Sequence, residues 1–253
     1  MAAVTEVLAA FARGEASQSD VVRALLTHDE WYAPMMWLDE AFPQRRVYDR
    51  MIPTPALGQA PGPGRLWLFT GTDQVQAAID AGGTFAAAGG PVPGLELFGA
   101  LTRSVSEVRV NPAAPAEQEW LMGVDDDMLD FLARWISALE VESALNAGSE
   151  DLGPRLAGFE HYVVPVDGTG RPRVVAMQKP PGNYVMAFTA PDLYLDHQKR
   201  DSGVTGSADM AAAALFQLAD YDGVDGVVLN MTESDSFVLP TDLCQAVLKL
   251  TVA

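Results

Sequence analysis

The sequence has few of the residues on which common kinds of protein chemistry depend. Its 253 residues include one cysteine, Cys244, and three histidines, and only three of the 16 basic residues are lysines. A single cysteine excludes an internal disulfide, so we expect a protein of the reducing cytoplasm. The phosphate-binding motif Gly-x-x-x-x-Gly-Lys-Ser/Thr is absent, which disfavours phosphate chemistry.

Long apolar runs and positive charge are also scarce. No run approaches the roughly 18 apolar residues of a membrane span, and residues 1–6 do not have the features of a secretory signal. The formal net charge is −18, divided as −11 over residues 1–145 and −7 over residues 146–253. This charge repels nucleic acid and anionic membranes, so neither is an expected partner. Solubility alone explains the acidity; the alternative is an acidic face that binds a basic protein.

Against these absences, the sequence has the composition of a globular protein. Hydrophobic residues make up 49% and charged residues 20%, which is enough apolar material for a packed core. A chain of this length forms one large domain or two of ordinary size.

A repeated stretch favours two domains. Gly64–Asp73 and Gly182–Asp192 both predict a short apolar strand that ends in Phe-Thr and leads into a helix with an acidic first turn. The matching residues lie 119 positions apart and are Phe69, Thr70 and Asn111 in the first half, and Phe188, Thr189 and Asn230 in the second. We therefore predict a duplicated α/β unit.

The predicted fold is of the α/β (α+β) class, with two tandem copies of a small mixed-sheet unit. Each copy is expected to run strand-strand-strand-helix-helix-strand-strand-helix. The predicted domains are residues 1–145, which begin with a helical extension, and residues 146–253.

Several segments carry clear local signals. Ser17 and Asp20 form a Ser-x-x-Asp pattern that predicts a helix start. The apolar periodicity of Asp125–Glu140 predicts a helix, as does the alanine-rich Ala208–Leu218. The Pro/Gly-rich segment Pro53–Gly64 predicts a loop with no counterpart in the second half, and the small residues between Gly82 and Pro93 predict another loop.

The second half resembles the SseB family of bacterial proteins, which is named for enhanced serine sensitivity. The resemblance rests on the strand Tyr162–Val166, the Asp167-Gly168 turn, the Ala187-Phe188-Thr189 strand end and the later strand that closes with Asn230. It implies a small α/β domain, and it brings no catalytic group that can be carried over to this sequence.

The first half resembles the same domain more loosely, through Tyr32-Ala33-Pro34, Leu68-Phe69-Thr70 and Val110-Asn111-Pro112. It departs from the second half in its Pro/Gly-rich loop and in holding all five tryptophans. The resemblance therefore implies two tandem SseB-like domains.

No arrangement of residues predicts catalysis. His28 follows a predicted helix, His161 begins a strand, and His197 lies on a helix predicted to be exposed, among Asp196, Lys199 and Arg200. None belongs to a nucleophile motif such as Gly-x-Ser-x-Gly. Cys244 is expected in the core of the last helix. We therefore predict a protein that is not an enzyme and has no cofactor.

Two acidic segments are candidate metal sites. Asp220–Gly226 superficially resembles an EF-hand loop, but Val224 occupies the fifth position and Met231 the twelfth, where oxygen ligands are required. Asp125, Asp126 and Asp127 are best explained as a helix N-terminus. No metal ligands are predicted.

The leading hypothesis is a non-catalytic, acidic protein-interaction or regulatory module, with another protein, of basic character, as the partner. The alternative is a small-ligand binding protein with a pocket between the two halves; a hydrolase without a recognisable motif comes third. The candidate ligand or partner surface consists of Trp67, Phe69, Thr70, Tyr184, Phe188 and Thr189. Ordinary core packing also explains these aromatic residues.

Overall fold

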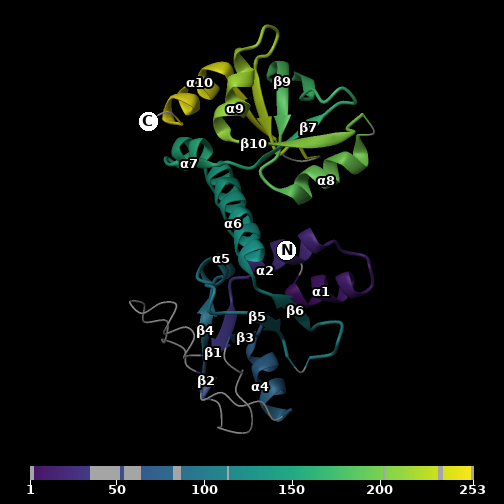
Figure 1. Ribbon diagram of the computed structural model, residues 1–253, viewed down its shortest axis with the longest axis vertical. Helices are drawn as coiled ribbons and strands as arrows, with labels where there is room; N and C mark the ends of the chain where they lie inside the picture. Colours follow the sequence, from purple (N-terminus) through teal and green to yellow (C-terminus); the bar gives the residue numbers. More distant parts are fainter. Residues whose placement is uncertain are drawn as a thin grey trace. The chain divides into compact units, whose positions relative to one another are not determined.

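The computed structural model describes residues 3–34, 52–53, 64–81, 87–112, 114–201, 203–232 and 236–251. These residues form a mixed α/β structure, which confirms the predicted class. The chain divides into two compact units, unit 1 (Met1–Ile136) and unit 2 (Ser137–Ala253) (Figure 1). The division falls inside one 22-residue helix, α6 (Asp126–Ala147), which also contains the predicted boundary after residue 145.

Unit 1 contains two small sheets among its described residues. The mixed sheet has the order β3-β5-β6, and the antiparallel sheet has the order β1-β4-β2. In chain order the elements are α1 (Val4–Ala12), α2 (Gln18–Leu26), β1 (Trp31–Pro34), β2 (Ile52–Pro53), β3 (Arg65–Leu68), α4 (Thr72–Asp80), β4 (Ala87–Val92), α5 (Gly94–Gly99), β5 (Glu107–Val110), β6 (Trp120–Gly123) and α6. Most of the predicted Pro/Gly-rich loop, residues 54–63, lies outside the described residues.

The start of α2 confirms the helix-start signal in the sequence. The Ser17 hydroxyl accepts a hydrogen bond from the backbone N–H of Asp20 (3.2 Å), and the Asp20 carboxylate accepts one from the backbone N–H of Ser17 (2.7 Å). This reciprocal cap satisfies two donors that the helix leaves free. It fixes the turn that directs the apolar face of α2, residues 21, 22, 25 and 26, into the core.

Unit 2 has the same kinds of elements. Its mixed sheet has the order β12-β11-β9-β8, and β7 pairs with β10 in a two-stranded antiparallel sheet. In chain order, after the end of α6, come α7 (Leu152–Gly158), β7 (Tyr162–Val166), β8 (Val174–Gln178), β9 (Pro181–Ala187), α8 (Pro191–Arg200), β10 (Gly206–Met210), α9 (Ala212–Gln217), the 3₁₀ helix η1 (Leu218–Asp220), β11 (Gly226–Leu229), β12 (Phe237–Pro240) and α10 (Thr241–Leu250). Helix α10 packs against α7 and α9 (Figure 1).

The predicted order of elements is wrong at one place in each unit, because a strand lies between the two helices. In unit 1 this strand is β4, within the segment predicted as a loop, and it pairs with β1. In unit 2 it is β10, which includes residues 208–210 at the beginning of the predicted helix Ala208–Leu218. The α-helix α9 begins only at Ala212. Both strands form by pairing with a strand far away in the sequence, which local propensity does not reveal.

Equivalent interactions tie together the elements of each unit. An aromatic side chain at the start of the first strand donates a hydrogen bond to a carbonyl of the preceding helix and packs edge-to-face on a phenylalanine of a later helix. The donor, carbonyl and phenylalanine are Trp31, Leu25 and Phe98 in unit 1, and Tyr162, Leu156 and Phe216 in unit 2. The hydrogen bonds measure 3.0 and 2.9 Å, and the ring centroids lie 5.9 and 5.7 Å apart.

Each mixed sheet contains one parallel pair of strands. Strand β3 pairs with β5 in unit 1, and β9 pairs with β11 in unit 2. The last residues to pair are Leu68 and Val110 in unit 1, and Ala187 and Leu229 in unit 2. Because parallel strands end at the same edge of a sheet, the residues that follow them come together there.

Gly226, which begins β11, allows β12 to approach closely. Its φ is +146°, and a Cβ there would lie 2.1 Å from the backbone oxygen of Leu239. We expect Gly226→Ala to lower the free energy of unfolding by at least about 2 kcal/mol, because it adds both a clash and backbone strain. Urea denaturation followed by circular dichroism measures this change.

Gly168→Ala is the matched control, since nothing lies within 4 Å of a Cβ at that turn. It should change the free energy of unfolding by less than about 0.5 kcal/mol. Equal losses in the two variants would contradict the argument from close approach.

Candidate functional site

A threonine and an asparagine meet at the end of each parallel strand pair. In unit 1 the amide oxygen of Asn111 accepts hydrogen bonds from the backbone N–H of Thr70 (3.0 Å) and from its hydroxyl (3.2 Å). In unit 2 the amide oxygen of Asn230 accepts the same two bonds from Thr189, at 2.8 and 3.2 Å. In both units the asparagine side-chain NH₂ also lies within hydrogen-bonding distance of the threonine hydroxyl, at 3.1 and 2.9 Å. We call each arrangement a Thr–Asn joint.

The asparagines hold an uncommon backbone conformation in the joints. The φ angles of Asn111 and Asn230 are +49° and +52°, in the left-handed region, which asparagine tolerates better than most residues. Both are buried, and their backbone N–H groups donate to Leu68 and Ala187, the last residues of β3 and β9. Each asparagine therefore ends its own strand and holds the neighbouring strand where that strand turns into a helix.

The structure places the six predicted surface residues mainly in the cores of the two units. Phe69, Phe188, Tyr184 and Thr189 are buried, whereas Trp67 and Thr70 are partly buried. Trp67 packs on the cluster that contains Phe69, and Tyr184 and Phe188 share a cluster in unit 2. Three of the four aromatic residues, Phe69, Tyr184 and Phe188, thus contribute to the cores of their units. A pocket between the halves concerns the arrangement of the two units and stays a prediction.

Sequence reasoning found both Thr–Asn joints as matched residues but did not assign their contact. The available signal was the common spacing, because each threonine precedes its asparagine by 41 positions. The helices after the joints begin without a side-chain cap, since their N-cap residues are Gly71 and Ala190. The parallel register, rather than a cap, fixes each joint.

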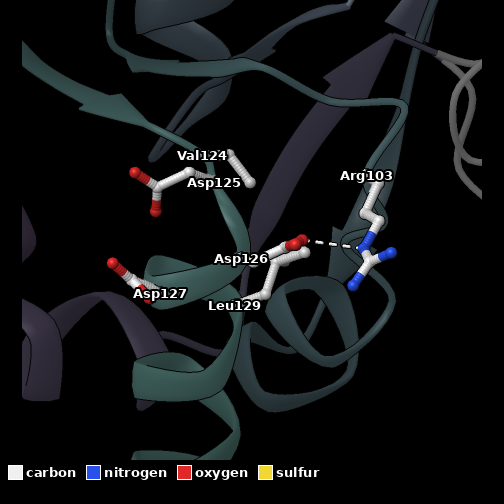
Figure 2. A pocket seen from close by; sticks show the side chains of 6 residues that line it. All are labelled: Arg103, Val124, Asp125, Asp126, Asp127 and Leu129. Atoms are coloured by element: carbon white, nitrogen blue, oxygen red, sulfur yellow. Dashed lines mark ion pairs between the residues drawn. The ribbon is translucent and has the colours of Figure 1, made fainter.

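A pocket of about 420 Å³ opens in unit 1 where α6 begins (Figure 2). Its lining residues are Arg103, Val124, Asp125, Asp126, Asp127 and Leu129. Arg103 forms an ion pair with Asp126 (2.7 Å), while the side chains of Asp125 and Asp127 extend away from Arg103. Asp125 also caps the helix, because its carboxylate accepts a hydrogen bond from the backbone N–H of Met128 (2.8 Å). Among the described residues, Asp126 is thus paired with Arg103, while Asp125 and Asp127 point away from that cation.

Unit 2 contains a compact polar group on the inner side of α8. The ring of His197 is only 9% exposed and packs on Phe188, with the ring centroids 5.3 Å apart. Its Nε2 lies 3.8 Å from a carboxylate oxygen of Asp201, which also accepts a hydrogen bond from the Arg173 guanidinium (3.0 Å). The exposed position predicted for His197 is therefore wrong, because Tyr194 and His197 share the face of α8 that turns inward.

Burial shapes the electrostatics of this group. Desolvation lowers the pKa of His197, Asp201 opposes that shift, and Arg200 and Arg173 add to it. A hydrogen bond from the backbone N–H of Gly203 and the Arg173 guanidinium hold the pKa of Asp201 below its usual range. Within the described part of the chain, His197 Nε2 and Arg173 Nε are buried without a hydrogen-bond partner. Burial therefore favours the neutral form of the His197 ring.

The other histidines and the cysteine have packing or pairing roles. His28 packs edge-to-face on Trp31 at 4.9 Å, and His161 Nδ1 lies 3.2 Å from an Asp209 carboxylate oxygen across the β7–β10 pair. Cys244 is buried and its thiol donates to the backbone oxygen of Leu239 (3.2 Å). Burial raises the pKa of this thiol to about 12, so it stays protonated and unreactive at neutral pH.

The acidic turn before β11 has a structural role as well. The Asp225 carboxylate accepts a hydrogen bond from the backbone N–H of Asn183 (2.8 Å), which fastens the turn to the start of β9. Among the residues that the structure describes, no group of three or more His, Cys, Asp or Glu side chains is arranged to hold a metal ion. No helix in the described ranges has the length and apolar character needed to cross a membrane.

Comparison of the chain with protein-family models, curated proteins and solved structures finds no match.

Removing a Thr–Asn joint should destabilise the protein. We expect Asn230→Ala to lower the free energy of unfolding by about 2–4 kcal/mol, because Thr189 N–H loses its acceptor and alanine is strained at positive φ. Asn230→Gly should recover about 1 kcal/mol of this loss, because it removes the strain but not the missing hydrogen bonds. Urea denaturation tests both; equal losses in the two variants would show that strain contributes nothing.

The stability of the protein should depend on the protonation of His197. Its pKa is lowered in the folded protein, so as the pH falls below roughly 6.5 the unfolded chain takes up this proton first. Folding stability is therefore highest above that pH and declines as the pH approaches the lower folded pKa. We expect His197→Phe, which keeps a ring on Phe188, to lose less stability than wild type between pH 7.5 and 5.5. Denaturant midpoints at the two pH values measure this loss in each protein. A His197→Phe variant that loses as much stability as wild type over this pH range would contradict the prediction.

Proposed function

We propose that this chain is a non-catalytic, acidic protein-binding module of the SseB-like type, built from two copies of one domain. The partner is a protein with a basic surface. The distribution of charge carries the proposal: the chain has a net charge of −18, and the pocket at the start of α6 has three aspartates and one arginine among its six lining residues.

The common organisation of the two units supports the duplication. From β1 in unit 1 and from β7 in unit 2, the described elements follow the order of three strands, a helix, a strand, a helix, two strands and a helix, and each unit has a Thr–Asn joint. The hydrogen bond from the first strand's aromatic residue to the preceding helix also recurs. A shared domain explains these matches together, since buried hydrogen bonds with the same partners constrain both sequence and spacing.

The environment of the chemically capable side chains supports a non-catalytic role. His197 is buried against Phe188, His28 packs on Trp31, and Cys244 is a protonated core thiol. A catalytic nucleophile needs a base within hydrogen-bond reach and room for a substrate. The contacts of these residues serve packing instead.

The lining of the pocket favours a protein partner over a small metabolite. Small-molecule pockets are lined mainly by hydrophobic and aromatic residues. Here Val124 and Leu129 are the only apolar lining residues among those described, and neither is aromatic. A cationic side chain from a partner suits this pocket, because Asp125 and Asp127 offer carboxylates that Arg103 does not neutralise.

Neutralising the pocket should weaken binding of the basic partner. The triple variant Asp125→Asn/Asp126→Asn/Asp127→Asn keeps the cap acceptor at position 125 while removing three charges. A stoichiometric partner captured from lysate at physiological salt is purified and titrated by calorimetry. We expect a roughly tenfold higher Kd for the variant.

The control removes the same three charges elsewhere, with Glu150→Gln/Glu160→Gln/Asp222→Asn at exposed positions of unit 2. It should bind like wild type at physiological salt, because long-range charge effects are then screened. Failure to capture a stoichiometric partner, an acidic partner, or equal weakening by both variants would each refute the proposal.

A further inference from the structure

Strand β8 has an open edge. It forms one end of the sheet β12-β11-β9-β8, and no described strand pairs with its outer side. The backbone oxygen of Arg173 accepts a hydrogen bond from Met186 N–H (3.0 Å). Since the bonding direction alternates along an antiparallel strand, the backbone groups of residues 174, 176 and 178 point away from β9. An edge of this kind is ready to pair with another strand.

The side chains of β8 leave this edge unguarded. Its sequence, Val-Val-Ala-Met-Gln, contains no charge and no proline, which are the usual means of protecting an edge. Val175 and Met177 pack on the core cluster of unit 2 and fix the strand in place. Val174, Ala176 and Gln178 are exposed, with Val174 at 48%. The strand is thus anchored on one face and open on the other.

Positive charge flanks β8 in an otherwise acidic protein. Between Asp167 and Asp192 the sequence has no acidic residue, but it has Arg171, Arg173 and Lys179. The guanidinium of Arg173 already forms an ion pair with Asp201. Arg171 and Lys179 are exposed just outside the two ends of the strand. The edge therefore presents uncharged backbone with a cation near each end.

We propose that the outer edge of β8 binds an extended peptide segment that carries acidic side chains at both ends of an uncharged centre. The segment adds to the sheet as a further strand. Main-chain hydrogen bonds supply affinity in this mode of recognition, and the flanking charges select the partner. The proposal goes beyond the acidic pocket, because it concerns unit 2 and a partner surface of the opposite charge.

A second copy of this chain is the less suitable occupant. Antiparallel pairing of β8 with itself about its central residue would bring Arg173 of one copy opposite Lys179 of the other. Like charges directly opposite each other destabilise a strand pair. The net charge of −18 on each copy adds further repulsion. An acidic segment avoids the first disadvantage, because its carboxylates face Arg171 and Lys179 rather than a like charge.

A labelled synthetic peptide tests the proposal. The probe is fluorescein-Glu-Val-Thr-Val-Thr-Val-Glu, and the comparison peptide has lysine in place of both glutamates. Fluorescence anisotropy with the full chain at low salt should give a Kd at least about threefold lower for the acidic peptide. Hydrogen exchange of the β8 amides should slow when the acidic peptide binds, which locates the contact.

Two variants separate the edge from the charge. Ala176→Pro removes an outward N–H without removing a hydrogen bond to β9, and it should weaken binding of the acidic probe roughly tenfold. Arg171→Glu/Lys179→Glu keeps the backbone edge and should weaken binding roughly three- to tenfold. The control Arg134→Glu/Lys249→Glu makes the same change of charge at exposed positions of α6 and α10 and should bind like wild type. Circular dichroism verifies that each variant is folded.

Any of three results would overturn the proposal. The first is that the acidic probe fails to bind at millimolar concentration, and the second is that the lysine peptide binds as tightly as the acidic probe. The third is that the Arg134→Glu/Lys249→Glu control weakens binding as much as Arg171→Glu/Lys179→Glu. Self-association of the free chain that Ala176→Pro abolishes, measured by analytical ultracentrifugation, would assign the edge to a second copy instead. None of these results depends on the acidic pocket, so they leave the proposed function to its own test.

Discussion

The structure of each unit depends on the hydrogen bonds of the Thr–Asn joint. A parallel strand pair ends with several backbone groups unpaired at one edge, and burying them without partners would cost about 1–3 kcal/mol each. The asparagine oxygen accepts the first free N–H after one strand, while its own backbone N–H donates to the last carbonyl of that strand. Because its φ angle is positive, the asparagine also turns the chain out of the sheet at the end of its own strand. One residue thus ends one strand and positions the helix after the other, so the register of the parallel pair and the start of the helix are fixed together.

The parts of the fold that depend on local signals were predictable from the sequence. The Ser17 cap with Asp20 and the apolar periodicity of α6 are examples, since both act within a few residues. Strands β4 and β10 were not predictable, because glycine- and alanine-rich segments become strands here only by pairing with β1 and β7. The prediction for His197 was wrong for a related reason: three charged neighbours, Asp196, Lys199 and Arg200, suggested an exposed helix, but packing on Phe188 sets the inward face of α8. The common spacing identified the residues of the joints, while their hydrogen bonds required the parallel register.

Buried polar groups divide into two kinds in this protein. Those of the Thr–Asn joints are satisfied by one another, as expected for groups that specify a single arrangement of strands. His197 and Arg173 share one carboxylate, and a ring nitrogen of the histidine has no hydrogen bond among the described residues. A hydrogen-bonded neutral group contributes the same stability at any pH and affects the fold only when it is mutated. The contribution of a titratable group without a full set of hydrogen bonds also changes when the group takes up a proton. The joints therefore set the architecture, and the contribution of the polar group on α8 to stability varies with pH.

The acidity of the chain and the neutral edge of β8 bear on each other. An open, uncharged edge strand promotes aggregation because any other exposed strand can pair with it. In this chain the edge carries no guarding charge of its own, but the net charge of −18 disfavours approach of a second copy. The same net charge would also repel an acidic peptide unless cations lay beside the edge. Arg171 and Lys179 occupy those positions, and no carboxylate separates them in the sequence. Long-range repulsion thus acts on a second copy and on an acidic peptide alike, while the short-range attraction of the two cations favours the peptide. The edge can therefore remain exposed in solution and still be selective.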